Sequence, residues 1–270
     1  MAKSTKYDAE SFWNKRYELF DITTSGHIDL PLEFNRWMYK LKLKKVRQAA
    51  ERYIGKWNIS KASVVDLGCG TGVYVEQWQA LKVEKLVGVD ISSKAVKNLQ
   101  KRHPKYQFYC ESIASNTGSG IPQQGSYDIV TAIGVLVHII DDQEFKAALK
   151  NIAKLVKPDG VILLAEYLCR DETQEFSYMK IRNIAWYKDA LTEAGLELVE
   201  QRPLYFLMGR PYDTPSAPMR YILPPIFNFT RRLAHRFPKL TGGVLYFTDL
   251  IITSMLTDGP SEELLVCRKK

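Results

Sequence analysis

Short and nearly continuous apolar runs alternate along the chain with longer segments whose apolar residues recur at helical spacing. The runs predict strands over residues 63–67, 86–90, 107–110, 127–132 and 161–165. The helical spacing predicts helices over residues 73–81, 93–102 and 142–155. Apolar strands that alternate with helices are typical of a parallel sheet covered on both faces. We therefore predict a doubly wound α/β fold.

The two ends of the chain follow other patterns. Residues 8–20 carry aromatic residues at helical spacing, and a second amphipathic helix is predicted from about Leu32 to Trp57. A helix over 186–194 leads into a strand at 196–200, and 262–268 reads as a last strand. The proline-punctuated stretch 204–260 is too long for a loop without structure, so we expect short helices there.

This pattern predicts four regions. They are an N-terminal helical cap or lid (1–60), a core (61–203), a helical insertion (204–260) and the last strand of the core sheet (261–270). The aromatic and basic residues of the insertion fit a cover over a partly apolar, anionic ligand. A homodimer interface explains the same apolar content equally well.

With 270 residues, 46% of them apolar, the chain can bury a full core, and we expect no metal site. Four cysteines without CxxC spacing favour a reducing compartment. No apolar run approaches the roughly 18 residues of a membrane-spanning helix, and the start of the sequence does not resemble a secretory leader. The expected location is the cytoplasm.

Basic residues are concentrated in two stretches, 40–52 and 210–239, within a net charge of +8. Such surfaces attract nucleic acid, phosphorylated substrates or anionic lipid, so peripheral contact with a membrane is one interpretation. A solvated basic face is the other.

The strand at 63–67 ends in an acid, Asp66, and runs into Gly68-Cys69-Gly70-Thr71-Gly72. Glycines at such a turn let the backbone approach a ligand where any Cβ would collide. The spacing is GxGxG instead of the GxGxxG of dinucleotide folds. Asp66 and its neighbours are thus placed to receive a cationic aminoacyl group instead of a pyrophosphate.

Two more acids follow the next strands. Asp90 ends the second strand, where a carboxylate accepts both hydroxyls of a ribose, and Glu111 follows the third, within reach of an adenine amino group. Acids at successive strand ends lie on one edge of a parallel sheet, which favours an adenosine-containing ligand. The alternatives are that Asp66 caps the turn, Asp90 caps the next helix and Glu111 is a solvated loop acid.

These residues resemble the small-molecule branch of the class I S-adenosylmethionine-dependent methyltransferases. Residues 64–72, 88–92, 110–112, 127–139 and 155–160 are similar to successive motifs of that family, within a match over about 60–200. Cys110 and Glu111 depart from it, since the family usually has Gly-Asp there. The resemblance implies a Rossmann-like, mostly parallel sheet of seven strands and S-adenosylmethionine as cofactor. It implies a cofactor site that includes Trp13, Tyr17, Asp66, Gly68, Cys69, Gly70, Gly72, Asp90, Ile91, Glu111, Ser112 and Ile133, although Trp13 and Tyr17 fit a packed core equally well.

Methyl transfer from a sulfonium is an in-line displacement that needs alignment and, for a hydroxyl acceptor, a base. A base near neutral pH is most simply a histidine. His138, just past the fourth strand, is the first candidate, although it could only hold its loop in place. His27, in a loop able to close as a lid, and Glu166, at the end of the fifth strand, are the others. Predicted substrate contacts are Tyr167, Tyr178, Arg182 and Tyr187.

The function predicted from these residues is methylation of an oxygen or nitrogen of a small molecule, such as a sugar, a lipid-linked compound or a secondary metabolite. Methylation of RNA or protein is the alternative, encouraged by the basic stretches. The sequence has no appended RNA-binding module, so nucleic acid is not expected as a partner. A non-catalytic scaffold is a third reading, which the intact glycines and acids disfavour.

Overall fold

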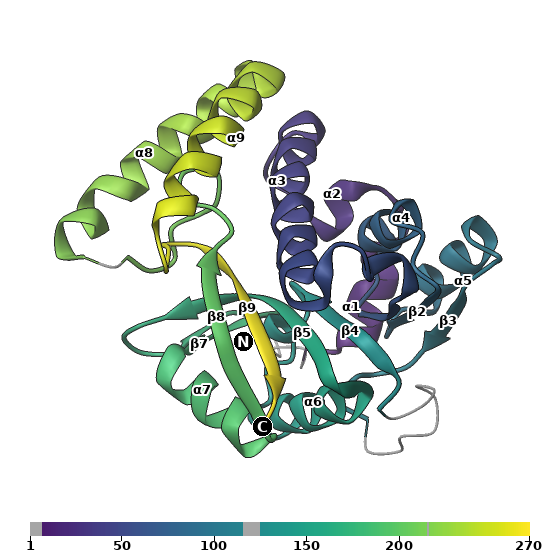
Figure 1. Cartoon of the computed structure of the whole chain (residues 1–270). Coiled ribbons are helices and arrows are strands. Elements are labelled where there is room, and N and C mark those ends of the chain that lie inside the picture. The colour runs from purple at the N-terminus through teal and green to yellow at the C-terminus, as the bar shows by residue number, and fades with distance from the viewer. Residues whose placement is uncertain (1–6, 116–124, 215) are drawn as a thin grey trace, which may run out of the picture.

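The computed structural model describes residues 7–115, 125–214 and 216–270, and its core is a mostly parallel sheet (Figure 1). Five strands run parallel in the order β3-β2-β1-β4-β5, and β9 and β8 continue the sheet as antiparallel strands. The strands are β1 (Ser63–Leu67), β2 (Lys85–Asp90), β3 (Gln107–Cys110), β4 (Tyr127–Ile133), β5 (Val156–Cys169), β8 (Leu196–Pro203) and β9 (Glu262–Lys269). This order confirms the predicted seven-stranded, mostly parallel sheet.

Helices cover both faces of this sheet, as the buried apolar runs predicted. They are α4 (Val73–Ala80), α5 (Ser93–Arg102), α6 (Asp142–Leu155) and α7 (Ile184–Glu193). One apolar core, containing Trp78 of α4 and Leu99 of α5, lies on one face. A second core, containing Phe145 of α6 and Tyr187 of α7, lies on the other. The doubly wound α/β architecture is therefore confirmed.

Two short strands extend the sheet and were not predicted. β7 (Lys180–Asn183) pairs parallel with the end of β5, and β6 (Gln174–Glu175) pairs antiparallel with β7. The far end of β5, which runs well past the predicted end at residue 165, forms this pairing. Strands of two and four residues are too short to show a period in the sequence.

The N-terminal helices lie over the carboxyl edge of the sheet. The segment forms α1 (Ala9–Arg16), α2 (Ile22–Ser25) and α3 (Leu32–Ala50), then a π-helical turn η1 (Glu51–Gly55) and a short 3₁₀ turn η2 (Ile59–Lys61). The entry helix ends four residues before the predicted position. Asp8 caps it by accepting a hydrogen bond from the Ser11 amide.

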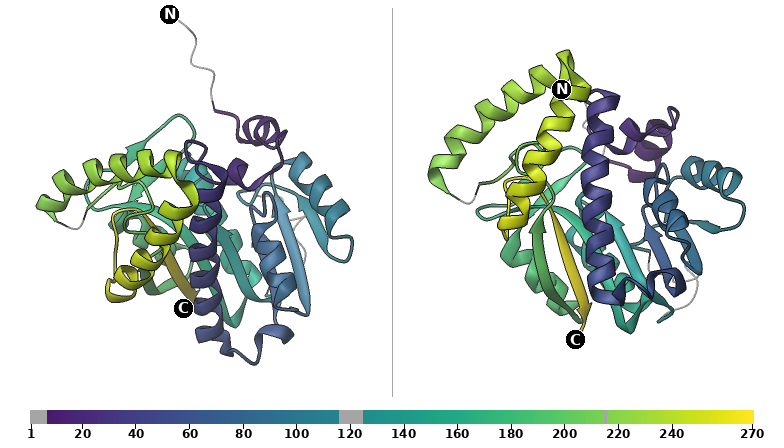
Figure 2. Two further views of the ribbon diagram at one scale, coloured as in Figure 1. Left: turned by 90° about the horizontal axis from the view of Figure 1, so that it is seen from above. Right: turned by 45° about the horizontal axis from the view of Figure 1, so that its top comes forward.

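The insertion consists of two long helices, so the expectation of short helices was wrong. α8 (Ala217–Arg236) and α9 (Pro238–Met255) follow one another directly. Pro238 begins α9, where its missing N–H costs nothing, and Pro224 and Pro225 are accommodated inside α8 on exposed positions. Prolines that we read as breaks thus stand within or at the start of helices. Two further views place α3 between this hairpin and the N-terminal helices α1 and α2 (Figure 2).

Three findings bear on composition. None of the described helices is both long and apolar enough to cross a membrane. All four cysteines are free thiols. Among the described residues, no three His, Cys, Asp or Glu side chains are grouped as a metal site would require. The first six residues and most of the loop predicted before β4 lie outside the described residues.

Candidate functional site

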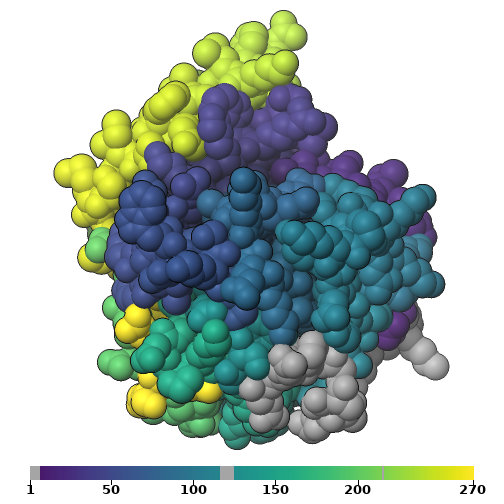
Figure 3. All heavy atoms as spheres, turned by 45° about the vertical axis from the view of Figure 1, so that its right-hand side comes forward, coloured from purple at the N-terminus to yellow at the C-terminus, as the bar shows by residue number. Residues whose placement is uncertain are grey.

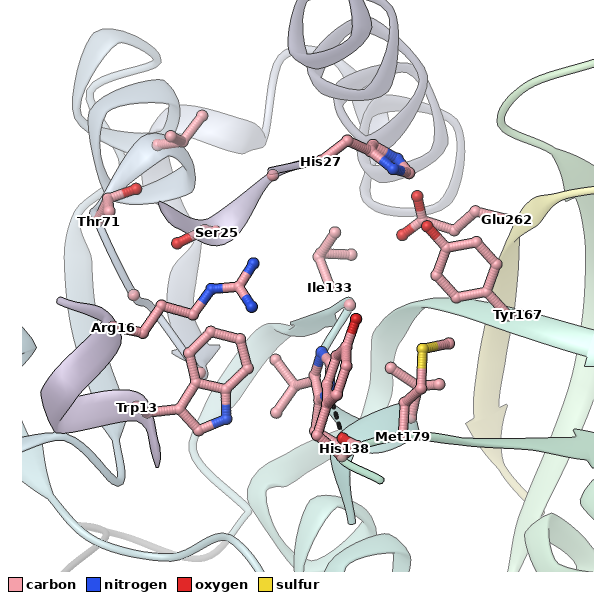
Figure 4. A pocket seen from close by; sticks show the side chains of 18 of the residues that line it. Trp13, Arg16, Ser25, His27, Thr71, Ile133, His138, Tyr167, Met179 and Glu262 are labelled. Atoms are coloured by element: carbon pink, nitrogen blue, oxygen red, sulfur yellow. Dashed lines mark hydrogen bonds between the residues drawn. The ribbon is translucent and has the colours of Figure 1, made fainter. Parts of the chain in front are cut away.

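A cavity of about 490 Å³ lies at the carboxyl edge of the parallel strands. Its walls come from the glycine loop after β1, the ends of β2 and β4, β5, the N-terminal helices and the insertion. In Figure 4, Trp13 and Arg16 of α1 stand on one side and Tyr167 and Glu262 on the other, with His138 and Ile133 between them. The volume falls in the usual range of small-ligand sites, roughly 300–1,000 Å³.

The glycine loop is shaped so that side chains are excluded from its surface. Gly68 and Gly70 have positive φ angles of 69° and 49°. A Cβ on Gly70 would lie 2.7 Å from the Tyr17 hydroxyl and 3.0 Å from Ser25 Oγ. The loop backbone therefore comes as close to the N-terminal helices as only glycine allows.

Asp90 fixes this loop from the next strand. Its Oδ2 accepts a hydrogen bond from the Gly70 amide at 2.8 Å, and its Oδ1 accepts one from the Ser92 amide at 2.8 Å. Burial raises the pKa of Asp90 to about 6, against the effect of these two bonds. Each carboxylate oxygen keeps a second lone pair, so Asp90 can hold the loop and still accept a ligand hydroxyl.

Asp66 is buried just before the loop and only half of its carboxylate is satisfied. Oδ1 accepts a hydrogen bond from Thr131 Oγ1 at 2.7 Å, while Oδ2 has no partner among the described residues. Burial raises its pKa to about 7, and Asp90 adds to the shift. Buried polar atoms are normally paired. The open oxygen of Asp66 is buried and does not line the cavity, so the cradle at Gly70 and the carboxylate of Asp90 are the features that fit a nucleoside-type ligand.

His138 lies in the 3₁₀ turn η3 (Leu136–His138) that follows β4. Its Nδ1 is 2.9 Å from the backbone carbonyl oxygen of Tyr178. Because a carbonyl can only accept, Nδ1 carries the proton and Nε2 keeps a free lone pair. Burial lowers the pKa of His138 to about 4, so the ring is neutral near pH 7. The rings of Trp13 and His138 pack in a T-shaped contact, with 4.9 Å between ring centres.

The entry helix closes one side of the cavity through a run of ring contacts. Trp13 stacks on Tyr17 at 5.6 Å, and the Tyr17 hydroxyl lies 3.4 Å from Ser25 Oγ. Arg16 donates from Nε to the Thr24 carbonyl at 2.6 Å, which ties α1 to α2. The helix itself buries none of its residues. These contacts are well suited to a segment that packs over a ligand.

The far half of the cavity is lined by phenol rings around a buried ion pair. Lys42 of α3 lies 2.6 Å from the carboxylate of Glu262, whose side chain is 1% exposed. Burial raises the pKa values of Tyr39, Tyr167 and Tyr205, so these hydroxyls stay protonated. Cavity residues that were not predicted from the sequence include Tyr39, Lys42, Tyr205, Arg210, Tyr212 and Glu262. Glu262 of β9 stands opposite Tyr167 of β5, a long-range pairing that no local pattern in the sequence reports.

Most of the predicted site residues lie on this one cavity. Those that line it are Trp13, Tyr17, His27, Gly68, Cys69, Gly70, Asp90, Ile91, Glu111, Ser112, Ile133, His138, Tyr167 and Tyr178. Those that do not are Asp66, Gly72, Glu166, Arg182 and Tyr187. Of the other histidines, His103 is partly buried and His235 is exposed.

The positions of three predicted residues are corrected by the structure. β5 continues to Cys169, and strand alternation turns Tyr167 to the cavity and Glu166 to the opposite face. Arg182 pairs with Asp142 at 2.9 Å and donates to the Ile139 carbonyl at 2.8 Å, so it braces the turn after His138. Tyr187 packs on Phe145 in the core, 5.2 Å between ring centres.

A glycine loop after the first strand, acids at successive strand ends and a cavity at the carboxyl edge define an α/β domain that binds a nucleoside-type ligand.

Comparison with known proteins narrows this class. Residues 64–160 match the family model described as a methyltransferase domain. A tRNA N(3)-methylcytidine methyltransferase of Schizosaccharomyces pombe is 31% identical over 44% of this chain and 41% of its own length. A ubiquinone/menaquinone biosynthesis C-methyltransferase of Campylobacter jejuni is 27% identical over 47% of this chain and 53% of its own length. The chain thus matches about half the length of these relatives.

A solved structure agrees on the fold. The 1,6-didemethyltoxoflavin-N1-methyltransferase of Burkholderia thailandensis superposes with a TM-score of 0.56 at 12% identity, over 98% of this chain and 92% of that one. The chain therefore contains a methyltransferase domain, and its fold is that of the class I S-adenosylmethionine-dependent methyltransferases.

Proposed function

We propose that the protein methylates an oxygen or nitrogen of a small molecule, using S-adenosylmethionine. The observation that carries the proposal is the single cavity that joins the Gly70 cradle to His138 and to the ring-lined end at Tyr167. In-line displacement needs the donor and the acceptor in one enclosed space. When bound, the cofactor supplies an electrophilic methyl group.

The cofactor end is assigned to the glycine loop and the acids around it. Asp90 would accept the ribose hydroxyls, Glu111 and Ser112 would lie toward the adenine, and Asp66 would act on the cationic end through the loop that follows it. Trp13 and Tyr17 would close the site from α1. The cradle without side chains and the position of Asp90 and Glu111 on the cavity wall support this assignment.

The acceptor end is assigned to the phenol rings and the charges near them. Tyr167, Tyr178 and Tyr212 line the cavity with ring surface and hydroxyl groups, and Arg210 adds a positive charge. A partly apolar, anionic acceptor fits such a surface. The helices α8 and α9 would then serve as the substrate cap of the 204–260 region, since Phe227 of α8 also lines the cavity.

His138 is proposed as the group that takes a proton from a hydroxyl acceptor. Its neutral ring presents a free lone pair at Nε2, and the carbonyl of Tyr178 holds the ring in that tautomer. His27, which also lines the cavity, is the second candidate. Glu166 is not proposed, since it lies off the cavity.

Methylation of RNA is the second candidate function, favoured by the relative that is named for tRNA. The basic stretch 40–52 supports it less than the sequence suggested, because several of its charges are paired with other groups of the protein. Lys42 pairs with Glu262, Lys45 donates to the Pro203 and Leu204 carbonyls, and Arg52 pairs with Glu200. A small-molecule acceptor therefore remains the first proposal. We also propose a cytoplasmic location, which the free thiols support because such thiols persist in a reducing compartment.

The first test is calorimetry with S-adenosylmethionine, S-adenosylhomocysteine and NADH. Saturable binding of the first two, weakened by Glu111→Ala and absent for NADH, is expected. Glu111 is the better variant than Asp90, whose carboxylate also holds the Gly70 and Ser92 amides. Absence of binding would instead favour the scaffold reading.

A second experiment separates the acceptors. Transfer of labelled methyl groups from S-adenosylmethionine is measured with a panel of sugars, phenols, amines and lipid-linked compounds, and in parallel with total tRNA. Transfer to a small molecule that is reduced in His138→Ala supports the proposal. Transfer to tRNA alone contradicts it.

A further inference from the structure

Helix α9 exposes an apolar stripe on the side away from the body of the protein. Its members are Leu240, Val244, Phe247, Ile251 and Met255, each between 57% and 79% exposed. Their spacing of three to four residues places them on one face. The opposite face, with Leu245 and Asp249, is buried, and Trp37 of α3 packs directly on Gly242. The helix is therefore apolar on the face that meets solvent as well as on the buried one.

Helix α8 repeats the arrangement. Ile222, Ile226 and Phe229 follow the same spacing, and Phe237 stands eight residues further on, at the end of the helix. These side chains are between 37% and 61% exposed. Phe237 and Leu240 are three residues apart at the junction of the helices, so the two stripes begin and end close together. In the space-filling view the hairpin projects from one end of the molecule (Figure 3). Exposed apolar surface of this extent marks an interaction site.

The charges on this hairpin have one sign. Arg232, Arg236 and Lys239 are exposed, and Lys40 of α3 lies beside Tyr246 of α9. Arg220, at the start of α8, pairs with Asp171 at 2.8 Å. The one acidic residue between 216 and 257 is Asp249, which is buried and accepts hydrogen bonds from the backbone amides of 206–208. The face is therefore apolar and cationic.

We propose that the α8–α9 hairpin docks on the surface of an anionic lipid bilayer. Aliphatic and aromatic side chains in a helix that lies in the membrane interface enter the boundary of the acyl chains, while Arg and Lys meet the head groups. A second copy of the same face would bring like charges together. RNA would pair with the cations but leave Leu240, Val244 and Ile251 exposed to water.

The hairpin that we propose to dock on the bilayer also forms part of the cavity wall. Phe227 of α8 lines the cavity and is the neighbour of Ile226 in the exposed stripe. A protein held by this face would keep the ring-lined end of its cavity close to the lipid. The docking itself does not depend on methyl transfer, so it can be tested separately from the proposed function.

The test is flotation of the full chain with vesicles of phosphatidylcholine alone and of equimolar phosphatidylcholine and phosphatidylglycerol. The wild type should bind the anionic vesicles far more tightly. Each basic residue near an anionic surface contributes about fivefold, so Arg232→Gln with Arg236→Gln should weaken binding by about 25-fold. Phe229→Ser with Phe247→Ser should weaken it at least as much.

Matched controls change exposed residues outside the hairpin. Leu19→Ser with Trp57→Ser removes two exposed apolar side chains, and Lys101→Gln with Lys105→Gln removes two exposed charges. Both should bind vesicles as the wild type does, and every variant should keep its binding of S-adenosylhomocysteine, which shows that it is folded.

Three outcomes would overturn the proposal. The first is that the wild type does not bind anionic vesicles, and the second is that the control variants lose as much vesicle binding as the hairpin variants. The third is that the hairpin variants keep vesicle binding but lose a dimer, measured by sedimentation velocity, or lose tRNA binding. If the wild type does not bind S-adenosylhomocysteine, the proposed function is contradicted. Vesicle binding of the wild type and its variants would still test the docking.

Discussion

The imidazole Nδ1 of His138 and the backbone carbonyl oxygen of Tyr178 are 2.9 Å apart, across a separation of forty residues in the chain. The bond fixes the ring with Nε2 as the acceptor, because the carbonyl has no proton to give. β7 carries the segment after Tyr178 alongside the end of β5. The unpredicted short strand therefore helps to position the candidate base.

The ring of His138 should stay neutral far below the usual range of histidine. Its pKa is lowered to about 4 by burial, so the base form exists throughout pH 5–8. Nitrogen NMR of the protein should show the Nδ1–H tautomer and a titration near pH 4. A midpoint near 6.5 for His138 would contradict the arrangement.

Asp66 should make the ligand-free protein less stable as the pH rises. Its pKa is raised to about 7, so between pH 4 and 7 the folded state binds more protons than the unfolded state, and the free energy of unfolding falls with pH. Asp66→Asn should flatten this slope and stabilise the protein at pH 8 by roughly 1–4 kcal/mol. Urea denaturation between pH 5 and 8 measures both effects.

Asp128→Asn is the control for this experiment. The pKa of Asp128 is lowered by the hydrogen bond from Lys157 and those from Ser63, despite the opposing effect of burial. The group is thus ionised in both states above pH 5, and its loss should lower stability by the same amount at each pH. A slope in Asp66→Asn as steep as in the wild type would show that other groups cause it.

Sequence periodicity located the elements but not all of the site. The bounds of β1, α5 and α6 agree with the prediction, because apolar spacing and local caps decide them. The glycine loop was predicted because glycines at this spacing mark a turn where a side chain would collide with a ligand or with neighbouring helices. A contact between residues far apart in the chain leaves no such local pattern, so the ion pair between Lys42 and Glu262 was not predicted.

Two errors have definite physical causes. Glu166 was assigned to the cavity because β5 was expected to end there, whereas the strand continues and alternation reverses the facing of its side chains. The long helices of the insertion were hidden by prolines, which stand at the start of α9 and on exposed positions of α8. In both cases tertiary context decided the outcome.

The pair of Lys42 and Glu262 should be worth more to stability than an exposed pair on the same helix. Lys42→Met leaves the carboxylate of Glu262 buried without its partner and should cost about 3 kcal/mol. Adding Glu262→Gln should restore much of the loss. Arg36→Met breaks an exposed pair of α3 and should cost less than about 1 kcal/mol. Equal losses from Lys42→Met and Arg36→Met in urea denaturation would contradict the burial argument.

Gly70 should be required for ligand binding because the loop lies close to Tyr17, and comparison with Gly195 separates this effect from backbone strain. Gly70 and Gly195 both have positive φ angles, 49° and 76°, so alanine strains the backbone at either position by roughly 1–2 kcal/mol. Around Gly195 a Cβ meets nothing within 4 Å, whereas at Gly70 it lies 2.7 Å from the Tyr17 hydroxyl. Gly70→Ala should therefore displace α1 and weaken binding of S-adenosylhomocysteine by about tenfold or more, which corresponds to about 1.4 kcal/mol. Gly195→Ala should lose similar stability and keep the affinity. If calorimetry finds the same affinity loss in both, backbone strain alone explains it, and the close approach of the loop to Tyr17 has no part in binding.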